Sequence, residues 1–134
     1  MSNMARTVVL GASTKESRYS HKAVLLLKEY NHEVFPIGIK TGYIGETEIL
    51  TGQPVIKNVD TITMYLSEKN QIPMYDYILS LKPKRIIFNP GSENAELASI
   101  ANGEGIRVEH ACTLVLLRTG QYEMGGLYRD MAAH

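Results

Sequence analysis

Arg6-Thr-Val-Val-Leu-Gly-Ala-Ser13 decides the fold of this chain, because a short apolar, β-branched run passes directly into a glycine. A polar loop, residues 14–20, follows it. Apolar residues then recur at the spacing of a buried helical face: Ala23, Leu26, Leu27 and Tyr30. We expect a strand over residues 7–10 and a helix with Ser20 as its N-cap. This order of strand, glycine turn and helix is typical of α/β domains that bind a phosphate group where the strand ends.

Composition limits the class of protein. The 134 residues are 44% hydrophobic, which suits one folded domain. Lys and Arg number 14, as do Asp and Glu, so a nucleic acid is not the expected partner, because its binding needs a basic surface. No apolar run reaches the roughly 18–20 residues that span a bilayer, and residues 1–6 lack a signal-peptide layout. A single cysteine, Cys112, forms no internal disulfide, so we expect a cytoplasmic protein that does not bind a membrane.

Strand and helix patterns alternate along the rest of the chain. Strands are expected at residues 33–39, 54–56, 61–66, 85–89 and 106–110. Helices are expected at about residues 70–82 and, with Ser92 as N-cap, up to about Asn102. The glycine-rich stretch 40–53 is expected to be a loop that holds a small hairpin. The alternation predicts an α/β fold, a Rossmann-like three-layer sandwich with a mainly parallel sheet of five or six strands. The domain is expected to span residues 1–122, before a mobile tail at 123–134.

The residues near the glycine turn bear on which nucleotide would fit. The fingerprint G-x-G-x-x-G of dinucleotide sites is absent, because Ser13 stands where the second glycine would be. An NAD site has an acidic residue at the end of the second strand, whereas this chain has Lys40. A cation there favours a ligand with an extra phosphate on its ribose, such as coenzyme A (CoA) or NADP. The alternative is that Lys40 is a solvated surface lysine.

Three further residues have open interpretations. The planar guanidinium of Arg18 suits a pyrophosphate, but a surface ion pair with Glu16 is equally compatible with the sequence. Cys112 follows the last expected strand, and its pKa would be lowered at the N-terminus of a helix over residues 113–117. We favour the interpretation that Cys112 is a buried structural cysteine. His21 lies in the first turn of the first helix and could touch a phosphate, although we expect it to be exposed.

Several separated motifs together resemble the stand-alone CoA-binding domain proteins, which are related to the N-terminal domain of the succinyl-CoA synthetase alpha subunit. The resemblance covers Thr7 to about Tyr122 and rests on residues 9–13, 17–20, 34–37 and 89–94 and on Cys112. It implies a Rossmann-like fold that binds CoA or acyl-CoA. The chain departs from the family pattern at Gly38-Ile39, where the family often has Asn-Pro, and at Asn89, where it often has glutamine. These departures concern the adenine contacts more than the fold.

The resemblance also implies roles for individual residues. It assigns the pyrophosphate to Gly11, Ala12, Ser13, Arg18 and Ser20, and the 3′-phosphate end to Lys40. It places Tyr65 at the border of the ligand, Pro90 and Gly91 along the pantetheine arm, and Asn94 at the start of the next helix. Cys112 completes the candidate site, near the thiol end of CoA.

These observations predict non-catalytic binding of CoA or acyl-CoA, as a carrier, a sensor or a partner subunit. The sequence shows no nucleophile motif and no metal-ligand spacing. Two alternatives stay open. One is an NADP-dependent oxidoreductase on the same fold. The other is an interaction module with an empty nucleotide cleft, which would form an oligomer such as a homodimer through the apolar segment 113–122.

Overall fold

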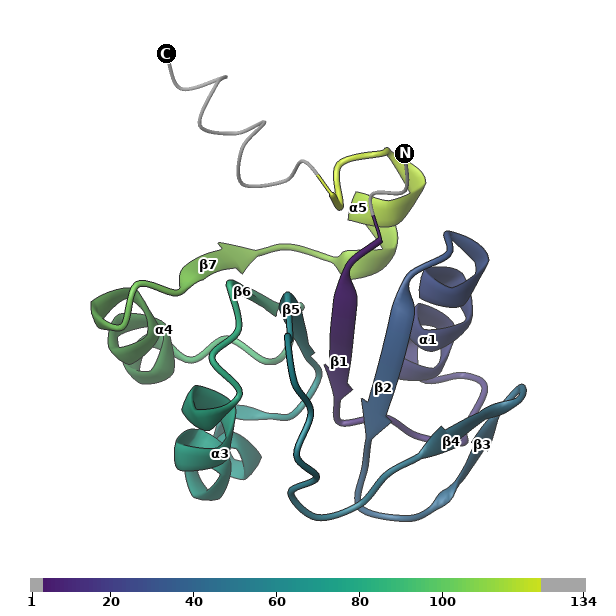
Figure 1. The fold of residues 1–134 in the computed structure, drawn as a ribbon, viewed down its shortest axis with the longest axis horizontal. Coiled ribbons are helices and arrows are strands. Elements are labelled where there is room, and N and C mark those ends of the chain that lie inside the picture. The colour runs from purple at the N-terminus through teal and green to yellow at the C-terminus, as the bar shows by residue number, and fades with distance from the viewer. Residues whose placement is uncertain (1–3, 124–134) are drawn as a thin grey trace.

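A parallel sheet of five strands forms the centre of the computed structural model, which describes residues 4–123 (Figure 1). The strands are β1 (Arg6–Leu10), β2 (Glu33–Ile37), β5 (Thr61–Met64), β6 (Arg85–Phe88) and β7 (Arg107–His110). Their order is β2-β1-β5-β6-β7, and each neighbouring pair is parallel. Because β2 lies on one side of β1 and β5 on the other, the direction of winding reverses between β1 and β5. Ligands of α/β proteins bind at such a switch point, outside the carboxyl ends of the strands.

Helices cover both faces of the sheet (Figure 1). One face carries α1 (Tyr19–Glu29) and α5 (Thr113–Arg118), and the other carries α3 (Tyr75–Ser80) and α4 (Ala95–Gly103). The short α2 (Glu68–Gln71) and the 3₁₀ turn η1 (Ile72–Met74) precede α3. The predicted α/β, Rossmann-like three-layer sandwich is therefore confirmed, with five strands in its parallel sheet.

Two apolar clusters hold the layers together, as the alternation of side chains along each strand requires. Val9 of β1 and Ile87 of β6 pack toward α1 and α5. Val8 and Ile86, their neighbours in sequence, pack toward α3 and α4. All four side chains are fully buried, which is why each strand has consecutive apolar residues at these positions.

The connection from β2 to β5 differs in part from the prediction. A hairpin of β3 (Gly42–Ile44) and β4 (Thr47–Ile49) forms within the glycine-rich stretch, but residues 54–56 form no strand. The edge of the sheet beside β2 is instead occupied by Leu50, which bridges to Ile37. The hydroxyl of Tyr77 in α3 donates a hydrogen bond of 2.6 Å to the carbonyl of Pro54. Pro54 is therefore bonded to α3 and not to a strand of the sheet.

Both predicted helix caps were wrong. Arg18 is the N-cap of α1 and no side chain caps this helix, while Ser20 lies buried in its first turn. Asn94 caps α4, because its Oδ1 accepts a hydrogen bond from the Leu97 N–H at 3.0 Å. The Ser92 hydroxyl instead donates to the carbonyl of Asn89 at 2.7 Å. Because the side chain of Arg18 does not cap α1, the first N–H groups of that helix have no side-chain partner among the described residues.

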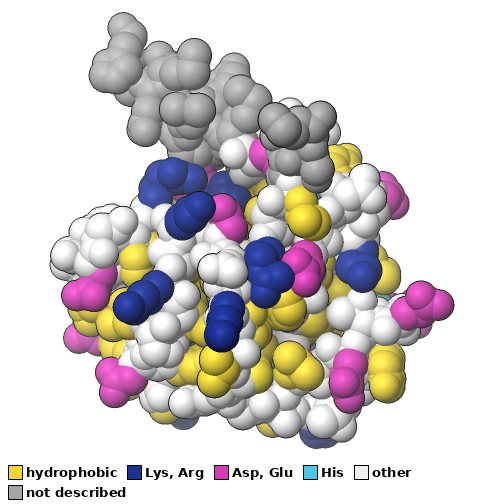
Figure 2. Space-filling model, viewed as in Figure 1, with side chains coloured by type: hydrophobic (Ala, Val, Ile, Leu, Met, Phe, Trp, Pro, Cys, Tyr) yellow, Lys and Arg dark blue, Asp and Glu magenta, His cyan; other side chains and the backbone are white. Residues whose placement is uncertain are grey.

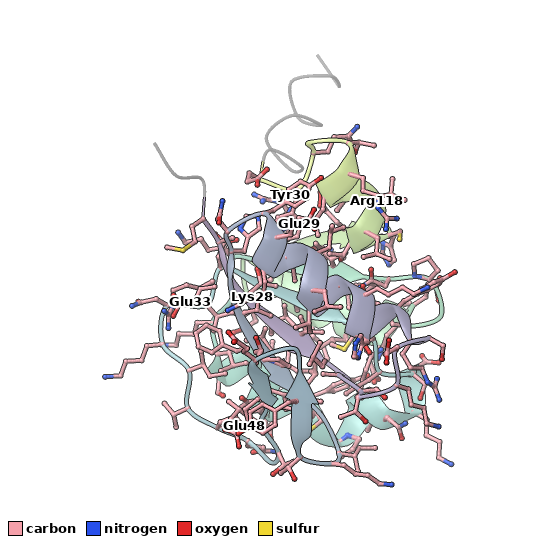
Figure 3. The ribbon with its side chains drawn as sticks, turned by 90° about the vertical axis from the view of Figure 1, so that its right-hand side faces the viewer. Lys28, Glu29, Tyr30, Glu33, Glu48 and Arg118 are labelled. Atoms are coloured by element: carbon pink, nitrogen blue, oxygen red, sulfur yellow. The ribbon has the colours of Figure 1, made fainter. Side chains whose placement is uncertain are left out.

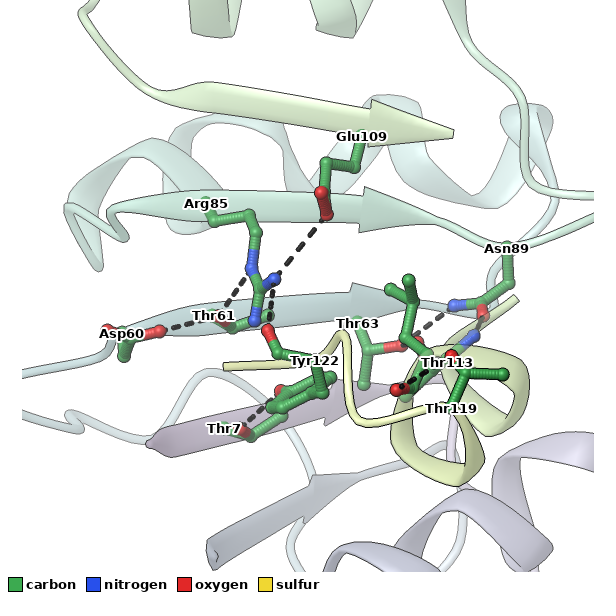
Figure 4. Close-up of polar contacts among 11 residues, drawn as sticks. Thr7, Asp60, Thr61, Thr63, Arg85, Asn89, Glu109, Thr113, Thr119 and Tyr122 are labelled. Carbon is green, nitrogen blue, oxygen red and sulfur yellow. Dashed lines mark hydrogen bonds and ion pairs between the residues drawn. The ribbon is translucent and has the colours of Figure 1, made fainter. Parts of the chain in front are cut away.

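The described chain ends against the amino-terminal edge of the sheet. Tyr122 is fully buried, and its hydroxyl shares a hydrogen bond of 2.7 Å with Thr7 of β1 (Figure 4). The carboxylate of Glu123 accepts a hydrogen bond of 3.0 Å from Nε2 of His32. Glu123, the first residue of the mobile tail predicted at 123–134, therefore contacts His32. Residues 124–134 of that tail lie outside the described part of the chain. No helix in residues 4–123 is long and apolar enough to cross a membrane.

Candidate ligand-binding site

A cavity of about 900 Å³ opens at the switch point, between the chain segments that follow β1 and β5. The loop after β1 and the first turn of α1 form one wall, and residues 65–67 with Asn70 form another. Lys40, which follows β2, reaches the same cavity. Seven of the predicted site residues line it: Gly11, Ala12, Ser13, Arg18, Ser20, Lys40 and Tyr65.

Gly11 allows the loop after β1 to lie against the segment that follows β5. Its φ of 103° is left-handed, and a Cβ at this position would lie only 3.0 Å from the carbonyl carbon of Tyr65. The N–H groups of Gly11 and Ala12 both donate to the carbonyl of Ile37, each at 2.9 Å. These two N–H groups are therefore used to join the loop to the end of β2, and an anion would have to find its donors further along the loop.

Such donors are present at the N-terminus of α1. In the described residues, the backbone N–H groups of Ser13 and Thr14 and those of the first helical turn, residues 19–21, have no protein acceptor. A helix N-terminus directs such N–H groups and the positive end of its dipole toward an anion. Because no side chain caps α1, these N–H groups are available as donors in the cavity wall.

Four cations line the cavity: Lys15, Arg18, Lys22 and Lys40. Within residues 4–123, no Asp or Glu lines it, although the chain as a whole has no net charge. On the face shown in Figure 2, by contrast, cationic and anionic side chains are interspersed. Among residues 4–123, no ion pair joins Arg18 to Glu16. The cavity therefore concentrates positive charge that an anionic ligand would neutralise.

Lys15 and Lys22 were not predicted as site residues. Lys22 lies one helical turn after Arg18, so the two share a face of α1, and this i, i+4 spacing was a usable signal. The Lys22 ammonium also lies 5.5 Å from the centre of the Tyr19 ring. Lys15 had no comparable signal, since only the course of the loop brings it to the cavity.

A second, apolar cavity of about 300 Å³ adjoins the first. The two share the residues Gly11, Ile39, Leu66 and Asn70. Six apolar side chains line the second cavity: Leu10, Ile37, Ile39, Leu66, Pro73 and Met74. An apolar group and a polyanionic group of one ligand would thus find matching surfaces side by side.

Tyr65 borders the large cavity and carries an enclosed hydroxyl. This hydroxyl has no hydrogen-bond partner in the described residues. The hydroxyls of Thr63 and Thr113 bond to each other instead, at 2.7 Å (Figure 4). Burial raises the pKa of Tyr65, so the side chain is neutral near pH 7. Tyr65 therefore provides a neutral wall beside the cationic one.

The other four predicted residues line neither cavity: Pro90, Gly91, Asn94 and Cys112. Pro90 and Gly91 form an exposed turn after β6, where the Gly91 N–H donates to the Glu93 carboxylate at 2.9 Å. Asn94 is buried as the cap of α4. Cys112 is half-buried at the N-cap of α5. Residues 4–123 contain no cluster of side chains that could hold a metal ion.

The sequence analysis did not select Gln71, which connects the cavity wall at Leu66 to the turn after β6. Its fully buried amide Nε2 donates to the carbonyl of Leu66 at 2.8 Å and to that of Ser92 at 2.7 Å. Its Oε1 accepts a hydrogen bond from Asn94 at 2.9 Å. Gln71 thereby holds the Leu66 wall, which both cavities share, against the turn after β6. A glutamine in a polar stretch gave no sign of this role.

Comparison with known proteins places this geometry in a family. The family model described as "CoA binding domain" matches residues 5–118. A crystal structure described only as an uncharacterized protein is 47% identical and covers 87% of this chain and 97% of its own, with a TM-score of 0.85. A hypothetical protein from Pyrococcus horikoshii OT3 has a TM-score of 0.74 at 15% identity, over 86% of this chain and 83% of its own.

A part of a larger enzyme has the same fold. The dinucleotide-forming acetyl-coenzyme A synthetase 1 of Ca. Korarchaeum cryptofilum matches 80% of this chain with 25% of its own, at 19% identity and a TM-score of 0.65. No curated protein sequence matches. The family model covers most of the chain, and the fold is that of the structures above. The chain therefore belongs to the CoA binding domain family.

Proposed function

We propose that this protein binds CoA or acyl-CoA in the two adjoining cavities and catalyses no reaction on it, acting as a carrier, a sensor or a partner subunit. The main support is the cavity wall, to which residues 4–123 contribute four cations and no carboxylate. CoA carries about four negative charges near pH 7, shared between its pyrophosphate and its 3′-phosphate. Ligand and cavity would therefore match in charge. Family membership supports the same ligand.

The arrangement of the walls suggests how CoA lies. The pyrophosphate would face the unpaired N–H groups of α1 and the guanidinium of Arg18. The adenine would enter the apolar cavity of about 300 Å³. Lys40 lines the large cavity directly after Ile39, which lines both cavities, and would contact the ribose 3′-phosphate. The pantetheine arm would leave past Tyr65 toward Pro90 and Gly91.

A non-catalytic role is supported by the types of side chain in the cavity. Among the described residues, the cavity is lined by hydroxyls, amides and cations, but by no His, Cys, Asp or Glu that would transfer protons near pH 7. The segment proposed for an interaction module packs largely inside the molecule, since Leu114, Leu116, Leu117 and Tyr122 are buried. The free thiol of Cys112 suits a reducing cytoplasm.

Calorimetric titration of the wild type and Lys40→Ala with CoA, dephospho-CoA and NADP tests the proposal. We expect the wild type to bind CoA more tightly than dephospho-CoA, because Lys40 contacts the additional phosphate. The substitution should weaken CoA binding about tenfold, or about 1.4 kcal/mol, and leave dephospho-CoA binding unchanged. Lys28→Ala is the matched control, since this lysine lies on α1 near Glu29 and Tyr30 and lines neither cavity (Figure 3).

Two outcomes of that titration would contradict the proposal. A wild type that bound neither CoA nor dephospho-CoA would favour the interaction module with an empty cleft. Tighter binding of NADP than of CoA would favour the oxidoreductase. An equal loss of affinity in Lys40→Ala and Lys28→Ala would remove the specific role of Lys40 while keeping CoA as the ligand.

We expect Cys112→Ser to bind CoA with unchanged affinity, because the thiol lines neither cavity. Mixing the protein with CoA disulfide tests whether the thiol exchanges with the ligand. Mass spectrometry without reductant should find any covalent adduct in the wild type only. A serine variant that lost reversible binding would show that the thiol belongs to the binding surface.

A further inference from the structure

His21 is buried beneath the loop that follows β1, contrary to the exposed position expected from the sequence. Its side chain belongs to the first turn of α1, and the residue is 7% exposed. Its Nδ1 lies 3.0 Å from the carbonyl oxygen of Ser13. Because a carbonyl can only accept, Nδ1 carries the proton and donates it to Ser13. This hydrogen bond joins the start of the helix to the loop that lines the cationic cavity.

The bond fixes the orientation of the next N–H group. The Ser13 carbonyl and the Thr14 N–H belong to one planar trans peptide, so they point in opposite directions. With the carbonyl held toward His21, the Thr14 N–H points away from His21, which does not itself line the cavity. That N–H has no acceptor among the described residues, whereas the next one, of Lys15, donates to Ser13 Oγ at 3.1 Å.

We propose that His21 is a positioning residue that turns the Thr14 N–H toward the pyrophosphate of the ligand and keeps the Ser13 carbonyl away from it. Without the imidazole, the Ser13–Thr14 peptide is free to rotate. Rotation would place a carbonyl oxygen where the anion binds, so a donor would be replaced by a repelling acceptor. This role rests on the proposed function, since it requires a phosphate group at the N-terminus of α1.

Two substitutions separate the hydrogen bond from the bulk of the ring. His21→Phe keeps an aromatic ring and removes the donor. His21→Asn places an amide N–H close to the position of Nδ1 and restores the donor. Each variant is titrated with CoA and with adenosine 3′-phosphate, which contains the adenine and the 3′-phosphate but no pyrophosphate. The weaker ligand is followed by NMR chemical-shift changes.

We expect His21→Phe to weaken CoA binding about tenfold or more and to leave the adenosine 3′-phosphate affinity unchanged. His21→Asn should bring CoA binding back to within about threefold of the wild type. Equal losses for both ligands would mean that His21 only supports the fold, and would overturn the proposal. Unchanged CoA binding in His21→Phe would overturn it as well. If the Phe variant does not fold, His21→Gln replaces it, because its donor lies at the Nε2 position and does not reach Ser13.

Failure of the proposed function would be recognised separately. If the wild type binds no CoA, the same variants are titrated with inorganic pyrophosphate. A weaker pyrophosphate affinity in His21→Phe that His21→Asn restores would support the positioning role without CoA. Equal pyrophosphate affinities in all three proteins would overturn it.

Discussion

Replacing Arg85 with alanine should destabilise the fold by about 3–5 kcal/mol, the range observed when one partner of a buried charge pair is removed. Arg85 is 2% exposed at the start of β6. It donates to Thr61 Oγ1 at 3.0 Å and to the Tyr122 carbonyl at 2.8 Å, and its ion pair with Glu109 measures 3.4 Å (Figure 4). Its guanidinium also lies 4.6 Å from the centre of the Tyr122 ring. Arg85 therefore joins β5, β7 and the end of the described chain.

Arg6→Ala is the matched control for this substitution. Arg6 pairs with Glu33 at 2.6 Å, but their side chains are 31% and 45% exposed. An exposed pair contributes little, so we expect a loss below about 1 kcal/mol. Urea unfolding of both variants measures the difference. Similar losses in the two would show that the buried network contributes no more than a surface pair.

We expect Gly38→Ala to raise the Kd for CoA more than tenfold and to lower stability by about 1–3 kcal/mol, as overpacking does. A Cβ at Gly38 would overlap the carbonyl oxygen of Ala12 and lie 3.1 Å from Ile49 Cγ2. Ala12 is in the loop whose N–H groups bind the Ile37 carbonyl. The substitution must therefore displace the cationic loop or the end of β2, and Gly38 itself lines the apolar cavity.

Gly103→Ala supplies the control for the second prediction. Gly103 is the last residue of α4, and a Cβ there would meet no atom within 4 Å. Alanine should be neutral or add about 0.5–1 kcal/mol of stability, because glycine is a poor helix former. Titration with CoA and thermal unfolding are measured on both variants. A Gly38→Ala protein that bound CoA like Gly103→Ala would show that the close approach to Ala12 is not needed for the site.

The candidate site was predictable to the extent that it depends on neighbours in sequence. Gly11 directly follows β1, so the strand pattern pointed to it, and the family resemblance of the loop that follows selected Ser13 and Arg18. Lys40 was found by the same reasoning at the end of β2. Gln71 and the burial of His21 were not predictable, because their partners, Ser92 and Ser13, lie 21 and 8 residues away and only the folded chain brings them into contact.

The sequence by itself determined the layers of this protein. The uninterrupted β-branched and apolar runs of β1, β5 and β6 are stable only as buried parallel strands, and the helical patterns between them supply the cover. Only the tertiary structure decided which donors are available at the site. It left the N-terminus of α1 without a side-chain cap and used the Gly11 and Ala12 N–H groups in hydrogen bonds to the end of β2. In the described part of the chain, it also placed no carboxylate on the wall that carries Lys15 and Lys22. These outcomes depend on contacts across the sheet, which local preferences of the chain do not encode.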